Sequence, residues 1–238
     1  MSRAKNVVIT GATSGIGSAV AKAFAANGDK VFLVGRNQRK LSNYAKKIPP
    51  DLFLGTGLAD LGSADAVDSL ATTVERQIRK LDVIVHCAGV HESTALGVAD
   101  AITFDSLFSV NVRGPYLLTQ RLADRLASSK GQVLIVNSSV VRNFGAGVAV
   151  FKATQHALQG LADSLRQDFN KRDVRVSSIY PGQTSTPRLK RIYKQKKEPY
   201  DPKALLRASD VAELIVGLTN LPRRIEVTDV HARSAIPY

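Results

Sequence analysis

Cysteine is almost absent from this chain: Cys87 is the only one in 238 residues. A single thiol cannot form an intramolecular disulfide, and Cys87 sits in an apolar run, so the sequence indicates a reducing compartment. The segment before the first apolar run is too short for the apolar core of a signal peptide. No uninterrupted apolar stretch approaches the ~20 residues of a membrane span. We therefore expect a cytoplasmic protein with no membrane association.

Internal repeats and low-complexity tracts are also missing, which excludes solenoids and linker-joined arrays. Acidic residues are scarce beside basic ones, 20 against 33, and the net charge is +13. That charge permits nucleic-acid binding, but the chain has no recognised element that reads bases, so we do not expect a nucleic-acid partner. An apolar fraction of 44% is ordinary for a globular protein. We expect residues 1–238 to form one domain.

Short β-branched runs alternate with longer amphipathic stretches. The candidate strands are Val7–Thr10, Lys30–Gly35, Leu52–Gly55, Leu81–Cys87, Gln132–Asn137, Val174–Tyr180 and Arg224–Thr228. The clearest helical pattern is one apolar face made by Leu158, Leu161, Ala162, Leu165 and Phe169. Repeated strand–helix–strand units require crossovers between parallel strands. The sequence therefore predicts an α/β fold, a doubly wound parallel sheet of about seven strands.

Two segments interrupt this alternation. Gly55–Asp65 is rich in Gly, Ala and Asp, and we predict a loop beside a ligand crevice. Gln183–Lys203 is rich in Pro, Lys and Arg and follows the carboxyl end of a strand. Ligands of such sheets bind outside those ends, so we predict that this segment is a basic loop covering a substrate.

A glycine-rich motif comes directly after the first predicted strand and opens a helix. It reads Thr10-Gly11-Ala12-Thr13-Ser14-Gly15-Ile16-Gly17. Glycines there allow a tight turn and a close backbone approach to a pyrophosphate, which the N-terminus of the helix favours. A glycine-rich turn without a ligand is the alternative. We predict a nucleotide site whose contacts come from Gly11, Thr13, Ser14, Gly15, Ile16 and Gly17.

Further landmarks follow in order along the chain. They are His86-Cys87-Ala88-Gly89, Asn111 in Val110-Asn111-Val112, Asn137-Ser138-Ser139 and Tyr180-Pro181-Gly182. With the glycine motif, they resemble the short-chain dehydrogenase/reductase family, whose motifs are TGxxxGxG and NNAG. The resemblance covers essentially the whole chain and implies a Rossmann-type oxidoreductase of carbonyl or alcohol substrates. It also implies a homodimer or homotetramer that pairs the helices after Asn111 and around Phe151. No metal is expected.

The end of the second predicted strand bears on the choice of cofactor. An acid there would accept hydrogen bonds from a ribose, whereas Gly35 is followed by Arg36, whose guanidinium can fork onto a 2′-phosphate. We therefore predict NADP(H) rather than NAD(H); a solvated Arg36 is the alternative. Gly57 stands where the family often has an adenine-binding Asp, and only Asp60 remains nearby. The resemblance adds Ala88, Gly89, Gln155, Pro181, Gly182, Thr184 and Thr186 to the cofactor contacts, loop capping being the alternative for both threonines.

The resemblance also defines four catalytic positions. In the family a Tyr hydroxyl exchanges a proton with the substrate while hydride moves between nicotinamide and carbon, and a Lys four residues later lowers the pKa of that Tyr. Asn111 and Ser138 match the family's Asn and Ser. Thirteen residues after Ser138, where the family has its Tyr, this chain has Phe151, and four residues later Gln155 replaces the Lys.

The downstream sequence supports the same register, because Thr154–Leu158 resembles the family stretch SKxAL without a gap. Taking Lys152 as the family Lys instead puts Val148 at the Tyr position, requires compensating insertions and supplies no acid. The YxxxK match from Tyr193 to Lys197 comes too late in the chain, and we treat it as chance.

Phe151 has no hydroxyl and cannot exchange a proton, a loss that typically costs ~10²–10⁴ in rate. Gln155 has no charge, yet its amide can still donate to ribose hydroxyls. Another group could supply the proton instead. His91, in the loop after Gly89, has a suitable pKa, although a solvated loop His is the alternative. The other groups, which we expect to point elsewhere or to play no catalytic part, are Lys152, His86, His156 and Tyr180.

Six cations fall within ten residues of the predicted loop: Arg188, Lys190, Arg191, Lys194, Lys196 and Lys197. They could attract an anionic small molecule or an acidic protein, or form a solvated helix face.

Three functional hypotheses follow from these substitutions. The first is an NADP(H)-binding pseudoenzyme that acts as a sensor or interaction protein. The second is an atypical reductase or dehydrogenase that uses Ser138, a bound water or His91 for the proton. The third is a non-redox enzyme, such as a lyase or isomerase, in the same pocket.

Overall fold

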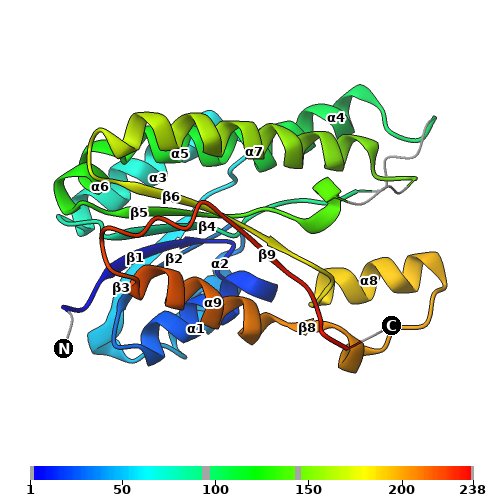
Figure 1. Cartoon of the computed structure of the whole chain (residues 1–238), viewed down its shortest axis with the longest axis horizontal. Coiled ribbons are helices and arrows are strands. Elements are labelled where there is room, and N and C mark those ends of the chain that lie inside the picture. The colour runs from blue at the N-terminus through cyan, green and yellow to red at the C-terminus, as the bar shows by residue number, and fades with distance from the viewer. Residues whose placement is uncertain (1–2, 93–96, 143–145, 237–238) are drawn as a thin grey trace.

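Seven strands pair in parallel to form the central sheet of the structure, a computed structural model that describes residues 3–92, 97–142 and 146–236 (Figure 1). They are β1 (Asn6–Thr10), β2 (Lys30–Gly35), β3 (Phe53–Leu58), β4 (Val83–His86), β5 (Gln132–Val136), β6 (Arg175–Pro181) and β9 (Asp229–Ala232). Their spatial order is β3-β2-β1-β4-β5-β6-β9, so the chain reverses its direction of winding between β1 and β4. The predicted fold class is confirmed. Ligands of such sheets lie outside the carboxyl ends of the strands at that reversal.

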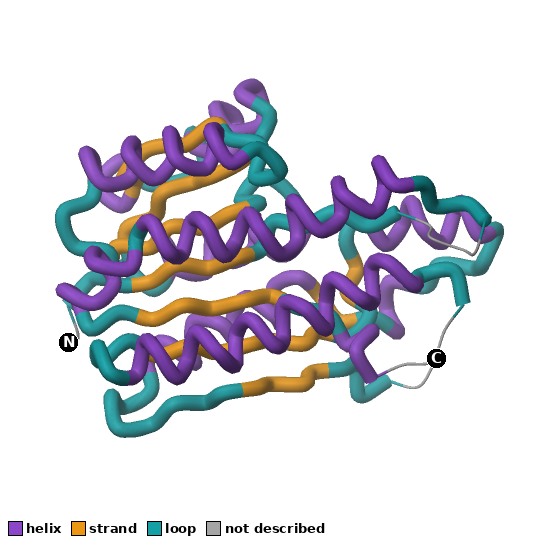
Figure 2. Tube along the Cα trace, turned by 90° about the horizontal axis from the view of Figure 1, so that it is seen from above, coloured by secondary structure: helices purple, strands orange, loops and turns teal. Residues whose placement is uncertain are grey.

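Helices cover both faces of the sheet. In Figure 1, α1 (Gly15–Ala26), α2 (Gln38–Ala45) and α9 (Ala208–Asn220) lie below it. Above it lie α3 (Ala64–Gln77), α4 (Ala101–Phe108), α5 (Gly114–Arg121), α6 (Ala123–Ser129) and α7 (Ala149–Asn170). Figure 2 shows the strands side by side with the helices running along them. The short strands β7 (Thr184–Ser185) and β8 (Leu206–Arg207) and the helix α8 (Pro187–Lys196) lie beyond the carboxyl ends of the strands (Figure 1).

The core has two parts because successive strand residues point to opposite faces of the sheet. Val8 packs with the α3, α5 and α7 side, and its neighbours Val7 and Ile9 pack with the α1 and α9 side. Each large apolar side chain buried in this way contributes roughly 1.5–3 kcal/mol. Two buried faces explain why the strands read as continuous apolar runs rather than as alternating ones.

The apolar face predicted for residues 158–169 is confirmed in α7. Leu158, Ala162 and Phe169 are buried in the core, and Leu161 and Leu165 pack against it. The helix ends at Asn170, where the polar run Asn170-Lys171-Arg172-Asp173 begins. It begins at Ala149, so the segment around residue 151 belongs to its first turn and lies at the carboxyl end of the sheet.

The strand predicted over Arg224–Thr228 is wrong in position, because the seventh paired strand is β9, Asp229–Ala232. Side chains supply much of the hydrogen bonding of the backbone just before it, and the bond to the neighbouring strand β6 comes at Thr228, whose carbonyl accepts from Ser178 N at 2.8 Å. The Arg175 guanidinium donates to the carbonyl of Ile225 at 2.8 Å, and Arg166 donates to that of Thr228 at 3.2 Å. The carbonyl of Ile225, satisfied in this way, does not need a strand partner.

The predicted loops are also corrected. Within the predicted loop Gly55–Asp65, β3 continues to Leu58, paired in parallel with β2 through Gly35. Glycines fit there because a Cβ on Gly57 would lie 2.3 Å from Leu70 Cδ1. The basic segment Gln183–Lys203 is not simply a loop either, since it contains α8. The sequence carried the signals of that helix, a capping Thr186, Pro187 in the first turn and basic residues in the last.

Candidate functional site

The glycine motif forms a turn whose backbone favours glycine at two positions. Gly11 and Gly15 have φ of +65° and +53°, in the left-handed region. A Cβ on Gly11 would lie 2.9 Å from the backbone N of Ala88, and one on Gly17 would lie 2.3 Å from the carbonyl O of Gly11. The turn is thus pressed against the segment after β4 and against the start of α1.

The first turn of α1 has unused donors, because Ser14 at its N-cap makes no side-chain capping bond and is exposed. Free N–H groups at a helix start bind anions, so this cradle fits a dinucleotide pyrophosphate. Among the other predicted contacts, Thr13 lies beside Gly35, with its Cγ2 3.1 Å from a Cβ built there. Ile16 instead packs against the core, which leaves its backbone as the part that faces the cradle.

The second wall of the crevice is the carboxyl end of β2. Arg36 follows Gly35, is exposed and precedes Asn37, whose side chain caps α2 by accepting from Lys40 N at 2.9 Å. Asp60 is exposed and accepts from the Gly62 backbone N at 2.9 Å, so its carboxylate shapes its own loop. Leu58, which pairs with Gly35, is 57% exposed and offers an apolar surface there. No sequence signal distinguished Leu58 from the buried residues of the other strands.

The third wall is the segment after β4, Ala88–Gly89. Thr10 Oγ1 accepts from the backbone N of Cys87 and of Ala88, both at 3.1 Å, which fixes this segment on the glycine turn. His86 is buried, and its Nε2 contacts Thr119 Oγ1 at 2.8 Å. Burial lowers the pKa of His86 to about 4, so this imidazole is neutral at pH 7 and buttresses the wall.

Asn111 is buried in a π-helical turn between α4 and α5. Its Oδ1 accepts from Val90 N at 2.8 Å, and its Nδ2 donates to Val90 O at 3.0 Å and to Thr154 Oγ1 at 3.2 Å. The side chain therefore ties the segment after β4 to α7. Sequence reasoning missed Thr154, which links this Asn to α7.

The other three of the four catalytic positions implied by the resemblance, Ser138, Phe151 and Gln155, lie where β5 meets α7. Ser138 follows Asn137, whose Oδ1 accepts from Ser138 N at 2.7 Å and whose Nδ2 donates to the Gln155 backbone O at 3.0 Å. Ser138 Oγ accepts from Val140 N at 3.2 Å. Phe151 and Gln155 are four residues apart on α7 and share a face. Phe151 is half-buried, and Gln155 is buried with its Nε2 donating to Thr154 Oγ1 at 3.3 Å.

His91 lies directly against Phe151. Their ring centroids are 4.7 Å apart in an edge-on arrangement at 62°, and His91 is half-buried. Burial is the main cause that lowers the pKa of His91, and the positive charge of Arg188 adds to it, while Glu92 opposes it. The structure therefore brings a mainly neutral imidazole to the position where the resemblance implies a Tyr.

Tyr180 lies elsewhere. It is fully buried and its ring stacks on His231 of β9, with centroids 4.3 Å apart. Burial raises its pKa to about 12. His156 is exposed on α7. Neither contacts Phe151 among the ring pairs of the described residues.

The segment after β6 reaches back to the glycine turn. Pro181 is buried at the end of β6, and Gly182 N donates to Ala232 O at 2.7 Å. Thr184 Oγ1 donates to Gly182 O at 2.9 Å, and Thr186 Oγ1 accepts from Leu189 N at 3.2 Å, so both hydroxyls cap this segment.

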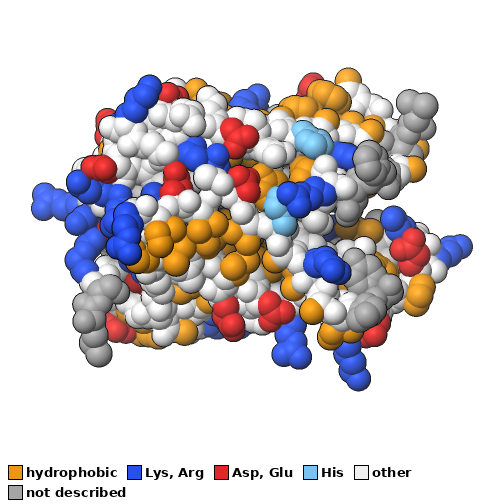
Figure 3. Space-filling model, in the orientation of Figure 1, with side chains coloured by type: hydrophobic (Ala, Val, Ile, Leu, Met, Phe, Trp, Pro, Cys, Tyr) orange, Lys and Arg blue, Asp and Glu red, His pale blue; other side chains and the backbone are white. Residues whose placement is uncertain are grey.

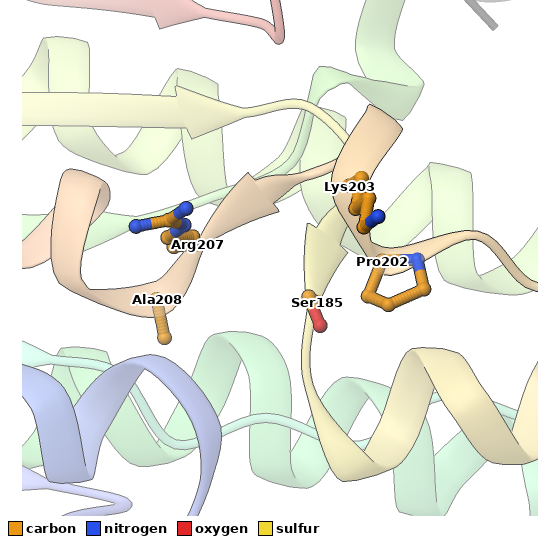
Figure 4. A pocket seen from close by; sticks show the side chains of 5 residues that line it. All are labelled: Ser185, Pro202, Lys203, Arg207 and Ala208. Carbon is orange, nitrogen blue, oxygen red and sulfur yellow. The ribbon is translucent and has the colours of Figure 1, made fainter.

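Beside β7 and β8 opens a pocket of about 330 Å³, and three of its lining residues, Ser185, Pro202 and Lys203, belong to the segment predicted to cover a substrate. Figure 4 shows Ser185 between Pro202 and Lys203 on one side and Arg207 and Ala208 on the other. None of these residues is a predicted cofactor or catalytic position. In the described residues, no group of three or more potential ligands could hold a metal ion, and no helix is long and apolar enough to cross a membrane.

Positive charge is not confined to α8. Figure 3 shows Lys and Arg side chains gathered also at the end of the molecule where the strands begin. Within the described residues, Arg188 alone among the α8 cations makes a side-chain hydrogen bond, from its guanidinium to Gly89 O. Its place in the crevice, rather than the total charge, distinguishes this residue.

Known proteins resemble this chain over nearly its whole length. An uncharacterized oxidoreductase of Staphylococcus haemolyticus is 30% identical over 227 residues, 95% of each chain, and one of Staphylococcus saprophyticus is 28% identical over 232 residues, 96% of this chain and 97% of the relative. A metagenomic short-chain oxidoreductase in complex with NADP superposes with a TM-score of 0.83, 26% identity and 98% coverage of both chains. An alcohol dehydrogenase of Thermococcus sibiricus complexed with 5-hydroxy-NADP has the same fold, with a TM-score of 0.88, 24% identity and 99% coverage of both chains. The profile of the short chain dehydrogenase family matches residues 5–197, and the chain therefore belongs to that family of oxidoreductases.

Proposed function

We propose that this protein binds NADP(H) in the crevice outside β1, β2 and β4. The glycine cradle and the open first turn of α1 fit a pyrophosphate. Arg36 fits a 2′-phosphate, because a guanidinium forks onto phosphate oxygens and the position lacks the acid that would bind a free ribose. The solved relative that is 26% identical is itself in complex with NADP.

We further propose that the ordinary redox chemistry of the family is lost or much reduced. The observation that carries this proposal is the pair on the first two turns of α7, where Phe151 and Gln155 share a face beside Ser138 and Asn111. Hydride arriving at a carbonyl leaves an alkoxide that needs a proton, and a phenyl ring has none to give. Gln155 also cannot supply the positive charge that would lower a neighbouring pKa, although its amide remains able to bind a ribose hydroxyl.

The test combines binding and turnover on the full-length wild-type protein. NADPH and NADH are titrated by calorimetry, with Arg36→Ala as the variant that removes the proposed phosphate contact. A panel of carbonyl and alcohol substrates is then offered with the bound cofactor. Tight NADPH binding without turnover supports the proposal. Turnover of a substrate at ordinary enzymatic rates contradicts the loss of chemistry, and binding of neither nucleotide contradicts the cofactor.

The edge-on contact between His91 and Phe151 favours a second candidate, an atypical oxidoreductase. An imidazole whose pKa lies below its ordinary value is neutral at pH 7 and suits a proton acceptor, hence oxidation of an alcohol. In that case His91→Gln removes any alcohol oxidation while NADP(H) still binds, and the rate falls as pH drops through the pKa of His91. An unchanged pH profile in His91→Gln contradicts this candidate.

We also propose a homodimer or larger homo-oligomer through α4, α5 and α7. A groove of about 680 Å³ runs among these helices and is lined by Phe108, Val112, Tyr116 and Leu161 with polar neighbours. Phe104 and Tyr116 are 45% and 38% exposed. Apolar side chains of this size at a surface groove are typical of a protein interface. A cytoplasmic location remains a proposal that rests on the single cysteine.

A further inference from the structure

The start of α8 meets the glycine turn. A Cβ built on Gly15 would lie 3.3 Å from Thr186 Cγ2, so the residue that caps α8 touches the turn that cradles the pyrophosphate. Two residues on, the Arg188 guanidinium donates to the carbonyl of Gly89 in the segment after β4. The basic helix is thus attached to the cofactor crevice at its first turn.

Arg36 reaches the same crevice from the other side. The end of β2 is fixed to the glycine turn, since Ala12 N donates to Val34 O at 3.0 Å. A Cβ on Gly35, the residue before Arg36, would lie 3.1 Å from Thr13 Cγ2. Arg36 and Arg188 therefore border one turn, the first from β2 and the second from α8.

Like charges gather at this place. Partial loss of water around its guanidinium lowers the pKa of Arg188, whose side chain as a whole is exposed, and the positive charges of Arg191 and Arg36 lower that pKa further. In the part of the chain that the structure describes, no carboxylate forms an ion pair with any of these three arginines. Cations held together without acids repel one another, and a multivalent anion between them removes that repulsion.

Helix geometry selects which α8 cations take part. Arg188 and Arg191 are three residues apart and lie on neighbouring positions of one face. At 100° per residue, Lys190 lies about 200° from Arg188 and points to the other side. Lys190 is exposed and carries the same charge, so the chain itself offers a matched control.

We propose that Arg188 and Arg191 join Arg36 to form one phosphate-binding cluster, which recognises the 2′-phosphate monoester of NADP(H) from both walls of the crevice. The inference rests on the proposed cofactor and assigns part of the selectivity for NADP(H) over NAD(H) to α8. A phosphate monoester carries close to two negative charges at pH 7 and several acceptor oxygens, enough for more than one guanidinium fork. The bound phosphate would then hold α8 over the crevice.

The test is calorimetric binding of NADPH, NADH, 2′,5′-ADP and inorganic phosphate to wild type, Arg188→Gln, Arg191→Gln and Lys190→Gln. Loss of a charge-assisted hydrogen bond weakens binding by roughly ten- to a hundredfold. We expect that loss for NADPH and 2′,5′-ADP in Arg188→Gln and a smaller one in Arg191→Gln. We expect no more than about a threefold change for NADH, and no change for any ligand in Lys190→Gln. Far-UV circular dichroism of each variant is the control that checks whether the fold is kept.

Several outcomes overturn the inference. It falls if Arg188→Gln and Lys190→Gln bind NADPH equally well, or if Arg188→Gln loses NADH and NADPH to the same extent. If the wild type binds NADPH tightly and Arg188→Gln binds it with the same affinity, the cluster is refuted and the proposed cofactor stands. Wild type that binds inorganic phosphate through Arg188 but none of the nucleotides refutes the 2′-phosphate and the cofactor while keeping an anion site.

Hydrogen exchange of residues 187–197 gives a readout that does not depend on affinity. We expect slower exchange of α8 with saturating NADPH than with saturating NADH. Equal protection by the two saturating nucleotides contradicts a 2′-phosphate that holds the helix.

Discussion

Replacing Gly11 with alanine tests whether the glycine turn is pressed against the segment after β4, the contact that builds the crevice. The new Cβ carries two costs. Gly11 has φ of +65°, and a residue with a Cβ pays roughly 1–2 kcal/mol in that region. The Cβ would also lie 2.9 Å from the backbone N and Cα of Ala88, which Thr10 holds in place, and overpacking of this kind costs roughly 1–3 kcal/mol.

Gly28→Ala is the matched control. Gly28 has φ of +81° and no heavy atom within 4 Å of a built Cβ, so alanine there pays the backbone cost alone. The entropy that alanine removes from the unfolded chain is common to both variants and cancels in their difference. We expect Gly11→Ala to be less stable than Gly28→Ala by about 1–3 kcal/mol, a difference in Tm of roughly 2–12 °C at this chain length.

Unfolding is followed by far-UV circular dichroism in urea, because the chain has no tryptophan for fluorescence. NADPH affinity is measured on the same samples and should fall in Gly11→Ala only. Equal losses of unfolding free energy in the two variants would show that the contact with Ala88 adds no cost, and that the glycine turn is not pressed against the segment after β4.

Three further predictions follow from buried or exposed side chains. Burial lowers the pKa of His86 to about 4, so as the pH falls this imidazole is protonated in the unfolded state before it is protonated in the folded state. The free energy of unfolding should therefore drop by roughly 3 kcal/mol between about pH 6.5 and pH 4 because of this group. His86→Gln should remove that part of the pH dependence of unfolding. Burial also raises the pKa of the Cys87 thiol, which should react with a disulfide reagent far more slowly in the native protein than in urea, and equal rates would contradict its burial. Tyr116→Lys should shift the mass measured by light scattering from oligomer to monomer, whereas an unchanged oligomer would exclude this face.

The sequence predicts the fold well because its signals are local. Buried strands read as apolar runs, and the apolar positions of α7 repeat with the helical period, so both follow from neighbouring residues. The strand predicted over Arg224–Thr228 failed for a non-local reason: the guanidinium of Arg175 bonds the carbonyl of Ile225, and the backbone bond to β6 comes only at Thr228, whose carbonyl accepts from Ser178 N. The extent of β3 was likewise decided by contacts of its glycines with distant side chains.

The candidate site divides in the same way. The positions of the glycine motif and of Phe151 and Gln155 follow from spacing along the chain. The contact of His91 with Phe151 and the approach of Arg188 to Gly89 join segments 60 and 99 residues apart. Neither is visible in a sequence without an alignment. The structure therefore places His91, a candidate for proton transfer, against Phe151, and within the described residues Arg188 is the one of the six cations at 188–197 that bonds the segment after β4.

The most direct measurement compares NADPH oxidation by the wild-type protein with that of Phe151→Tyr combined with Gln155→Lys, on the same carbonyl panel at saturating cofactor. The account predicts a wild type that binds NADPH and does not turn over, and a double variant that gains roughly 10²–10⁴ in rate over it. Wild-type turnover at about 1–10³ s⁻¹, with nothing added by the two substitutions, would contradict it.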